Sequence, residues 1–549
     1  MISIVSFIGF TLLVAVVAWY ATRKTDEKSA DGYFLAGRSL GAITIAGSLL
    51  LTNLSAEQIV GLNGQAFTEG ILVMAWETLA AIAMIITAVF LLPRYMRGGI
   101  TTIPQFVEDR FDHGTKAILT ALFLSGYVIV VIPSVLYSGS LAFSTMFDLP
   151  ELFGLSDTAT LWVCVWSIGI IGIFYAIFGG LKAVAVSDLI NSIGLLVGGL
   201  LIPAFGLMAI GDGSISDGIN VLWEANPDKF NVKGEVDNSI PFGTIFTGMM
   251  LVQMFYWGTN QVILQRVFGA KSLKEGQKGM ILAALIKFLI PIIVVLPGII
   301  AWHIFDGTLD NPDQAYPALV AKVLPAAFTG LFAAVLFGAV LSSFNSLLNS
   351  SATLFGFDLY KTYFKKDATE KQTVKAGKTF GLVLGILGMC VAPLIANAPN
   401  GLFAWLQEAN GCYSIPILTV IVVGFFTKRV PAIAAKVGVI SGVVLYSISQ
   451  FIVGPYFKDS ALAEAATNGI TDPKALSLIE AEAYPHFLHV MAILFVLNIS
   501  IMLIIGKYNP RATDYSPMTT DEVNIEPWKN AIIAGALITA LVLSTYLIF

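Results

Sequence analysis

Apolar runs of about the length that a helix needs to cross a lipid bilayer recur along the whole chain. Because roughly 20 apolar residues span the hydrocarbon core as a helix, the pattern predicts about fourteen membrane-spanning helices. They are expected at residues 2–21, 41–67, 70–93, 116–146, 159–178, 184–210, 241–266, 279–304, 327–360, 376–397, 400–426, 432–454, 485–506 and 528–548. We therefore expect an all-α membrane protein in which no segment is left for a soluble domain. The first run has neither a basic stretch before it nor a small-residue cleavage site, so we expect a retained helix rather than a signal peptide.

Basic residues alternate along the connections between these runs. Every odd-numbered run is followed by a basic connection, such as the one with Arg23, Lys24 and Lys28 after the first run and the one that starts at Arg266 after the seventh. The even-numbered runs are followed by connections with few or no lysines and arginines. By the positive-inside rule, the basic connections are cytoplasmic and both termini lie outside.

Composition excludes most other classes of protein. Hydrophobic residues make up 56% of the chain and charged residues 12%, and the mean hydropathy is +0.80, which is far from the composition of a soluble domain. The net charge of −5 lacks the basic surplus of a protein that binds nucleic acid. No Walker, metal-binding or catalytic motif occurs in the sequence, so we expect neither ATP-driven transport nor enzymatic activity.

Two ionisable residues of opposite sign, Glu77 and Lys287, lie well inside predicted spans. A charge at the bilayer centre costs roughly 2.5–3.5 kcal/mol on insertion scales, so such residues usually face a partner or a water-filled path. We interpret the two residues as part of a solute site. The alternative is a buried ion pair that only fixes helix packing, although such pairs stabilise a protein poorly compared with apolar residues.

The second predicted span is polar near its middle. Thr52, Asn53, Ser55, Glu57 and Gln58 fall within seven residues, and a helix that faces lipid cannot carry such a cluster. A helix broken near the midplane can carry it, because the freed carbonyl and amide groups line a cavity and bind an ion or a solute. A polar contact between helices, held by small residues, is the alternative.

Two further spans carry side chains suited to ligands. In the ninth span, Ser342, Ser343 and Ser346 begin a hydroxyl-rich stripe, and a hard cation such as Na+ prefers oxygen ligands. In the seventh span, Gln253 and Tyr256 belong to a run of amide and aromatic side chains that suits a sugar, whose ring stacks while its hydroxyls form hydrogen bonds. The alternatives are tight packing by small residues and aromatics that only mark the membrane interface.

Six segments give the chain a family resemblance. They are DGYFLAGRSL (31–40), LSAEQIVG (54–61), FYAIFGGLKAV (174–184), YWGTNQVILQR (256–266), KFLIPIIVVLPG (287–298) and SSFNSLLNSSATLFGFDLYK (342–361). With these segments in order, the chain resembles the sodium/solute symporter family, and within it the bacterial sodium/glucose (galactose) cotransporter branch.

This resemblance implies the leucine-transporter fold, which consists of two inverted five-helix repeats that each open with a broken helix. The repeats are expected at residues 41–210 and 241–426, with the external loop 211–240 between them. Residues 1–40 would supply an extra helix and a basic loop, and residues 427–549 would supply the extra C-terminal helices.

The resemblance also implies ligand sites. The matching sugar-binding residues are Gln58, Glu77, Gln253, Lys287 and Gln407, with Tyr256 stacking on the sugar. The sodium ligands would be the hydroxyls of Ser342 and Ser343 and the backbone carbonyls of Leu51, Leu54 and Ala339. Some relatives build a second sodium site at the positions of Asp188, Asn345 and Ser346, although Asp188 could also be a helix cap. Ala80, where sugar-transporting relatives can carry a hydroxyl, and Gln253, an asparagine or threonine in others, depart from the pattern and leave the particular sugar open.

The resulting hypothesis is a secondary active symporter that imports a neutral, glucose- or galactose-like monosaccharide with Na+ by alternating access. The alternative is the same fold with another solute, such as myo-inositol, an amino acid or a carboxylate, but a carboxylate fits poorly beside Glu77. An ion channel is a further alternative. We expect a multi-pass protein of the bacterial inner membrane with no nucleic-acid partner, in which a monomer suffices for transport although oligomers can form.

Overall fold

The computed structural model describes residues 2–22, 35–309, 311–397, 402–517, 519 and 523–548, and over these ranges the chain is almost entirely helical. Arg23, Lys24, Lys28 and the first four residues of the 31–40 segment lie outside these ranges, as do the side chains of residues 175–184. Two isolated β-bridges are the only strand-like pairings in the described part. The prediction of an all-α protein is confirmed.

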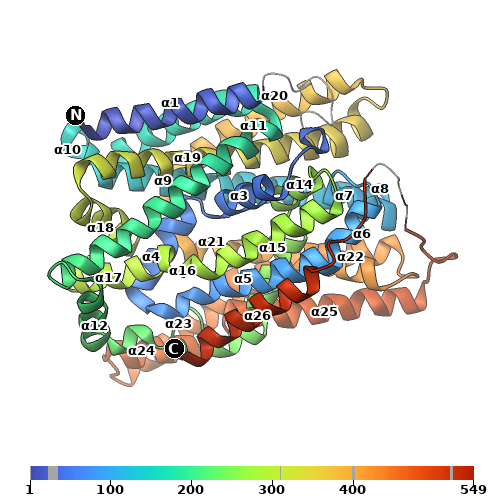
Figure 1. The fold of residues 1–549 in the computed structure, drawn as a ribbon. Coiled ribbons are helices and arrows are strands. Elements are labelled where there is room, and N and C mark those ends of the chain that lie inside the picture. Colours follow the sequence, from blue (N-terminus) through green and yellow to red (C-terminus); the bar gives the residue numbers. More distant parts are fainter. Residues whose placement is uncertain are drawn as a thin grey trace.

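The helices form one bundle of long, roughly side-by-side elements (Figure 1). The main ones are α1 (Ile2–Thr22), α3 (Ala42–Asn53), α4 (Ala56–Glu69), α5 (Ala75–Ile86), α6 (Leu92–Arg97), α7 (Ile103–Arg110), α8 (His113–Gly126), α9 (Ile132–Phe147), α11 (Asp157–Ile210), α13 (Gly248–Gly258), α14 (Gln261–Phe268), α15 (Leu273–Leu289), α16 (Pro291–Val294), α17 (Leu296–Ile304), α19 (Ala326–Thr353), α20 (Glu370–Val391), α21 (Leu402–Phe426), α22 (Ala432–Ile448), α25 (Phe487–Tyr508) and α26 (Ala531–Ile548). Short helices occupy the long connections between spans, namely α12 (Ile215–Ala225), α18 (Ala315–Val323), α23 (Gly454–Thr467) and α24 (Pro473–Ala483).

In the described part, ten helices are long and apolar enough to cross a membrane, or twelve when each of two bent helix pairs is taken as one span. Helix α11 holds two of the ten, Asp157–Phe174 and Ala185–Ile210, where the sequence predicts two separate spans. The remaining two predicted spans, residues 2–21 and 241–266, coincide with α1 and with the pair of short helices α13 and α14.

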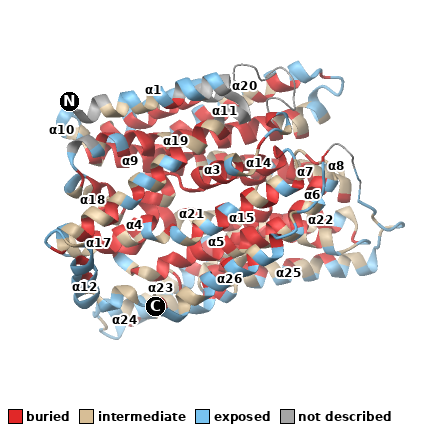
Figure 2. Cartoon of the chain, viewed as in Figure 1, coloured by how far each residue is buried: buried red, intermediate tan, exposed pale blue. Residues whose placement is uncertain are grey.

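The outer helices present apolar side chains to the surroundings. Ile440 on α22, Ile493 on α25 and Leu537 on α26 are all more than half exposed, which a water-facing surface rarely tolerates in such numbers. Figure 2 shows buried residues concentrated on the inner helices and exposed ones around the rim and at the ends. The share of buried residues is 89% in the span around α19 and 22% in α26, so α19 is central and α26 faces lipid.

The helix predicted to be broken near its middle is broken. Helix α3 ends at Asn53 and α4 begins at Ala56, and the two axes differ by 56°. Leu54 and Ser55 between them have non-helical backbone angles. Because the last carbonyls of a helix have no partner within it, this break leaves backbone oxygens near Leu51 and Thr52 available to other groups.

A second break separates α13 from α14 at Thr259 and Asn260. The side chain of Asn260 caps α14 by accepting a hydrogen bond from the backbone N–H of Val262 at 3.0 Å. The span that begins with α15 also bends, by 46°, where Pro291 follows the end of the helix. The broken helices and the bent span place polar backbone and side chains inside the bundle.

Candidate functional site

A cavity of about 90 Å³ lies in the middle of the bundle. Its walls come from the α3–α4 break, α5, residues 127–131 with the start of α9, the α13–α14 break, α15, α19 and α21. On the order of 10–15 Å³ is enough for one water molecule, so the cavity has room for several waters or a small solute. All six residues that the sequence predicts for the solute site line it, and they are Gln58, Glu77, Gln253, Tyr256, Lys287 and Gln407.

The two intramembrane charges contact each other. Glu77 stands in the first turn of α5 and Lys287 in the last turn of α15, and the Glu77 carboxylate pairs with the Lys287 ammonium. Both side chains are almost fully buried, at 2% and 0% exposed. The Lys287 Nζ atom also lies 5.7 Å from the ring centroid of Trp257. The pair offers the cavity hydrogen-bond donors and acceptors without net charge.

Several polar atoms of the cavity wall are held in place or left without a partner. Gln253 donates from its amide nitrogen to the backbone carbonyl of Trp76 at 2.7 Å, which fixes the side chain. Within the described residues, the hydroxyl of Thr52, the amide oxygen of Gln58 and the indole N–H of Trp76 have no hydrogen-bond partner. Since buried polar atoms in proteins are nearly always hydrogen-bonded, these three atoms are suited to contact water or a solute.

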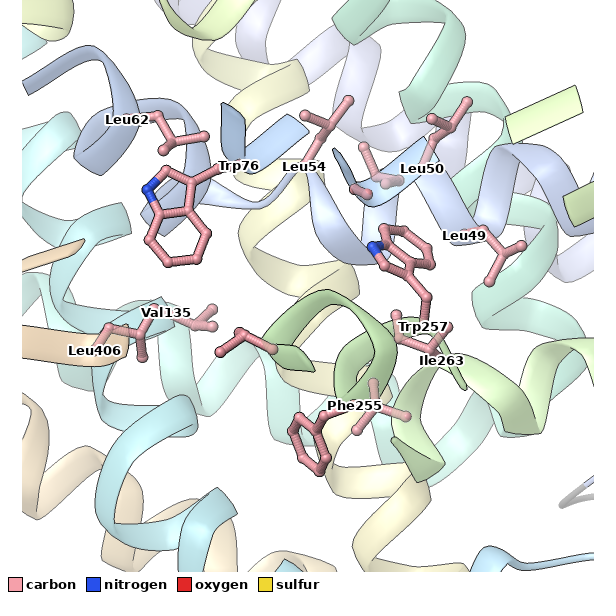
Figure 3. Close-up of a cluster of buried hydrophobic side chains, with 14 of the residues drawn as sticks. Leu49, Leu50, Leu54, Leu62, Trp76, Val135, Phe255, Trp257, Ile263 and Leu406 are labelled. Atoms are coloured by element: carbon pink, nitrogen blue, oxygen red, sulfur yellow. The ribbon is translucent and has the colours of Figure 1, made fainter. Parts of the chain in front are cut away.

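Aromatic rings complete the wall. Tyr256 and Trp257 pack edge to face with ring centroids 5.2 Å apart, and Trp76 packs in the same way on Phe403 at 5.4 Å. Figure 3 shows a cluster of buried hydrophobic side chains around the site. It includes the cavity-lining residues Trp76, Val135, Trp257 and Leu406, which come from α5, α9, α13 and α21. The cavity thus combines flat apolar faces with amide and charged groups.

The residues predicted for the sodium site lie where α19 meets the break between α3 and α4. Ser343 on α19 donates from its hydroxyl to the backbone carbonyl of Thr52 at 3.2 Å. The five predicted ligands are all buried, and they are Leu51, Leu54, Ala339, Ser342 and Ser343. The sequence did not single out the Thr52 carbonyl, which is the backbone group that Ser343 contacts. Hydroxyl and carbonyl oxygens of this kind are the ligands that a hard cation takes.

At the predicted second sodium site, the guanidinium of Arg266 lies among the expected ligands. Arg266 donates through Nε to the Ser48 hydroxyl at 2.9 Å, and that hydroxyl donates to the Asp188 carboxylate at 2.7 Å. The guanidinium also donates to Ser346 and lies 3.9 Å from Asp188, whereas the side-chain amide of Asn345 has no partner within the described part. Arg266, which the sequence groups with the basic connection after the seventh span, lies in the last turn of α14 and is only 1% exposed.

The sequence identified more of the polar residues that line the cavity than of the aromatic ones. Trp76 and Tyr127 line the cavity but stand in apolar runs, where an aromatic residue gives no signal that distinguishes a solute site from a lipid contact. Asn410 also lines it, one helical turn after Gln407, and that spacing is a signal that could have identified it.

Comparison with known proteins identifies a family. Residues 33–442 match the sodium:solute symporter family. A protein of Escherichia coli (strain K12) named uncharacterized symporter YidK is 45% identical over 99% of this chain and 90% of its own length. The sodium/glucose cotransporter of Vibrio parahaemolyticus is 33% identical over 82% of this chain and 86% of its own length.

A solved structure agrees on the architecture. The substrate-bound outward-open state of a Na+-coupled sialic acid symporter matches with a TM-score of 0.68 at 21% identity, covering 90% of this chain and 98% of that chain. At this identity the likeness concerns the fold alone, and it is the leucine-transporter fold that the sequence predicts. The protein is a multi-pass membrane transporter that couples a solute to Na+, not an enzyme, and it belongs to the sodium:solute symporter family.

Proposed function

We propose that this protein imports a neutral monosaccharide of the glucose or galactose type together with Na+ across the bacterial inner membrane. The observation that carries the proposal is that the six residues predicted for the sugar line one central cavity. Ser343, which is predicted to bind Na+, lines the same cavity. A cation and its cargo would therefore share one space, as coupling requires.

The chemistry of the wall favours an uncharged polyol. Each sugar hydroxyl is both a donor and an acceptor, and the Glu77–Lys287 pair together with the amides of Gln58, Gln253 and Gln407 provides both kinds of partner. Tyr256 provides a flat face for the apolar side of the ring. An anionic solute would meet the carboxylate of Glu77, whose charge Lys287 already balances.

Coupling follows from the position of the break between α3 and α4. Na+ held by the hydroxyls of Ser342 and Ser343 and by carbonyls at the break would draw α19 toward the broken helix. The same broken helix carries Gln58, so the bound ion would also set the position of a sugar ligand. An ion shifts the equilibrium between the outward-open and inward-open states only if it binds one of them more tightly. The contact between α19 and the broken helix must therefore differ between these two states.

We also propose that each cycle carries one Na+. The guanidinium of Arg266 already supplies a positive charge beside Asp188 and Ser346, so a second cation there would be repelled.

Helix α1 begins and α26 ends on the same side of the bundle (Figure 1), in keeping with termini that share one face. By the positive-inside rule we place that face outside.

Uptake into liposomes under an imposed Na+ gradient tests the proposal. We expect saturable uptake of a labelled monosaccharide that stops when K+ replaces Na+, with a Na+-to-sugar flux ratio of about one, as a single ion site requires. Unlabelled sugars, myo-inositol, amino acids and carboxylates are added as competitors. Competition by one of the other solutes, but not by sugars, would reassign the cargo within the same fold, whereas a current that does not saturate would indicate a channel.

Ser343→Ala should raise the Na+ concentration required for half-maximal uptake by about tenfold, because one oxygen ligand is lost. The measurement is the Na+ dependence of initial uptake at saturating sugar. Ser351→Ala is the matched control, since Ser351 lies on the same helix and, among the described residues, its hydroxyl donates to the carbonyl of Leu347 alone, at 2.7 Å. Equal Na+ dependence in the two variants would refute the assignment of Ser343.

A further inference from the structure

A second cavity, of about 340 Å³, opens at the ends of α6 and α21, far along the bundle from the start of α1 (Figure 1). Arg94 and Arg97 at the end of α6 and Lys428 just after α21 line it. The candidate spans in this region end at Arg97 and at Phe426, so the cavity lies at the level of the membrane surface. Because these residues are basic, the positive-inside rule places this membrane surface on the cytoplasmic side.

Three cations around this cavity form no close ion pair with the described part of the chain. Within the described residues, no carboxylate oxygen lies within 4.0 Å of Arg94, Arg97 or Lys428. Asp109 is the one carboxylate among the described residues that line the cavity, and it accepts a hydrogen bond from the hydroxyl of Tyr515 at 2.5 Å.

Three other cations at the same end of the molecule are paired with carboxylates. Arg429 bonds to Asp514 at 2.7 Å, Lys436 to Asp112 at 2.6 Å and Lys116 to Glu108 at 2.6 Å. These three charges are each balanced by a carboxylate, whereas Arg94, Arg97 and Lys428 form no such pair with the described residues.

The other wall of the cavity is apolar. Phe106 and Phe425 stack with ring centroids 4.4 Å apart, and both line the cavity. The guanidinium carbon of Arg94 lies 5.9 Å from the ring centroid of Phe425. Basic residues that only determine topology would extend separately into water. Here the basic side chains and the aromatic rings line the same cavity. That combination suits a ligand with an anionic group attached to an apolar body.

We propose that this cytoplasmic cavity binds a phosphate group, and that the phosphate is carried by an anionic phospholipid of the inner leaflet. Arginine and lysine side chains form charge-assisted hydrogen bonds to phosphate oxygens, and arginine can do so with two parallel bonds. Basic pockets between membrane helices on the cytoplasmic side are typical sites for anionic headgroups. The glycerol and first acyl carbons would contact Phe106 and Phe425.

The wall of this cavity also reaches the transport site. Tyr95 packs against Phe106 and Phe425 at centroid distances of 5.8 and 5.2 Å. Its hydroxyl donates to the carbonyl of Gly258 at 3.0 Å, and Gly258 directly follows Trp257 of the central cavity. A bound headgroup would therefore contact Phe106 and Phe425, which pack on Tyr95, and Tyr95 is hydrogen-bonded to the end of α13 at the second helix break.

Native mass spectrometry of the purified full chain, with phosphatidylglycerol or phosphatidylcholine added, tests the site. Arg97→Gln/Lys428→Gln should bind phosphatidylglycerol roughly 10- to 30-fold more weakly than the wild type, because two cations at the membrane surface are removed. Phosphatidylcholine binding should be unchanged. The matched control is Lys361→Gln/Lys365→Gln, which removes two exposed cations beside α7 and α8 that do not line the cavity.

A second arm separates the two sources of phosphate. Inorganic phosphate is titrated while the thermal unfolding midpoint is followed in the wild type and in both variants. Stabilisation by phosphate in the wild type and the control, but not in Arg97→Gln/Lys428→Gln, with no preference for phosphatidylglycerol, would keep the phosphate site but assign it to a soluble anion. If neither ligand distinguishes that variant from the control, the proposal is wrong. Because both readouts measure binding, the result does not depend on which solute is transported.

Discussion

Lys287→Met should abolish sugar uptake and lower the free energy of unfolding by about 3–5 kcal/mol, because it leaves the Glu77 carboxylate buried without its partner. Both side chains are almost fully buried, so water cannot replace the lost ammonium. Methionine keeps most of the aliphatic volume of lysine, so the loss of stability is due to the missing charge and not to a new cavity. Thermal unfolding of the purified protein and uptake into liposomes measure the two effects.

The double variant Glu77→Gln/Lys287→Met separates packing from function. With both charges gone, stability should return to within about 1–2 kcal/mol of the wild type, whereas uptake should stay absent. Recovery of uptake together with stability would mean that the pair only holds α5 against α15, and the solute role of both residues would be wrong.

Arg266→Gln should have the second largest effect, and its stability should become strongly dependent on Na+. Removing the guanidinium leaves Asp188 buried beside the hydroxyls of Ser48 and Ser346, at a cost of about 3–5 kcal/mol. These oxygens are ligands for a hard cation, so Na+ should partly replace the missing charge. We expect the unfolding midpoint of the variant to rise steeply with Na+ concentration, with more ions bound than in the wild type.

Choline chloride at equal ionic strength is the control for Arg266→Gln, since choline is too large for the site and screens charge equally. The variant Asp188→Asn/Arg266→Gln should lose the additional Na+ dependence, because the carboxylate is gone. An unfolding midpoint that responds equally to Na+ and choline would contradict the interpretation that the guanidinium occupies a cation site.

Much of the fold could be predicted because lipid imposes a simple rule on each span. A polar cluster such as Thr52 to Gln58 cannot face hydrocarbon, so the first helix break was visible in the pattern itself. The second break, at Thr259 and Asn260, entered only through the family resemblance. The polar residues Thr259, Asn260 and Gln261 do mark the position of this break, but the amides of that run were interpreted as sugar ligands. The division into repeats at residues 41–210 and 241–426 stays a prediction.

The candidate site was predictable residue by residue but not contact by contact. Glu77 and Lys287 are conspicuous because each is alone in an apolar run, but their separation of 210 positions gives no sign that they touch. The contacts of Arg266 could not be predicted, because it stands at the end of its predicted span, where hydropathy cannot tell a solvated residue from a buried one. Ser48 was missed because a lone serine in an apolar helix is usually a packing residue.

Two buried ion pairs bear on the energy that the proposed transport cycle can draw from the membrane potential. Glu77 cancels Lys287 and Arg266 balances Asp188, so these four side chains carry no net charge through the membrane field. With one Na+ and a neutral sugar, each cycle would be electrogenic and move a single elementary charge inward. A potential of 100 mV then contributes about 2.3 kcal/mol per turnover, which by itself supports roughly fifty-fold accumulation of the sugar.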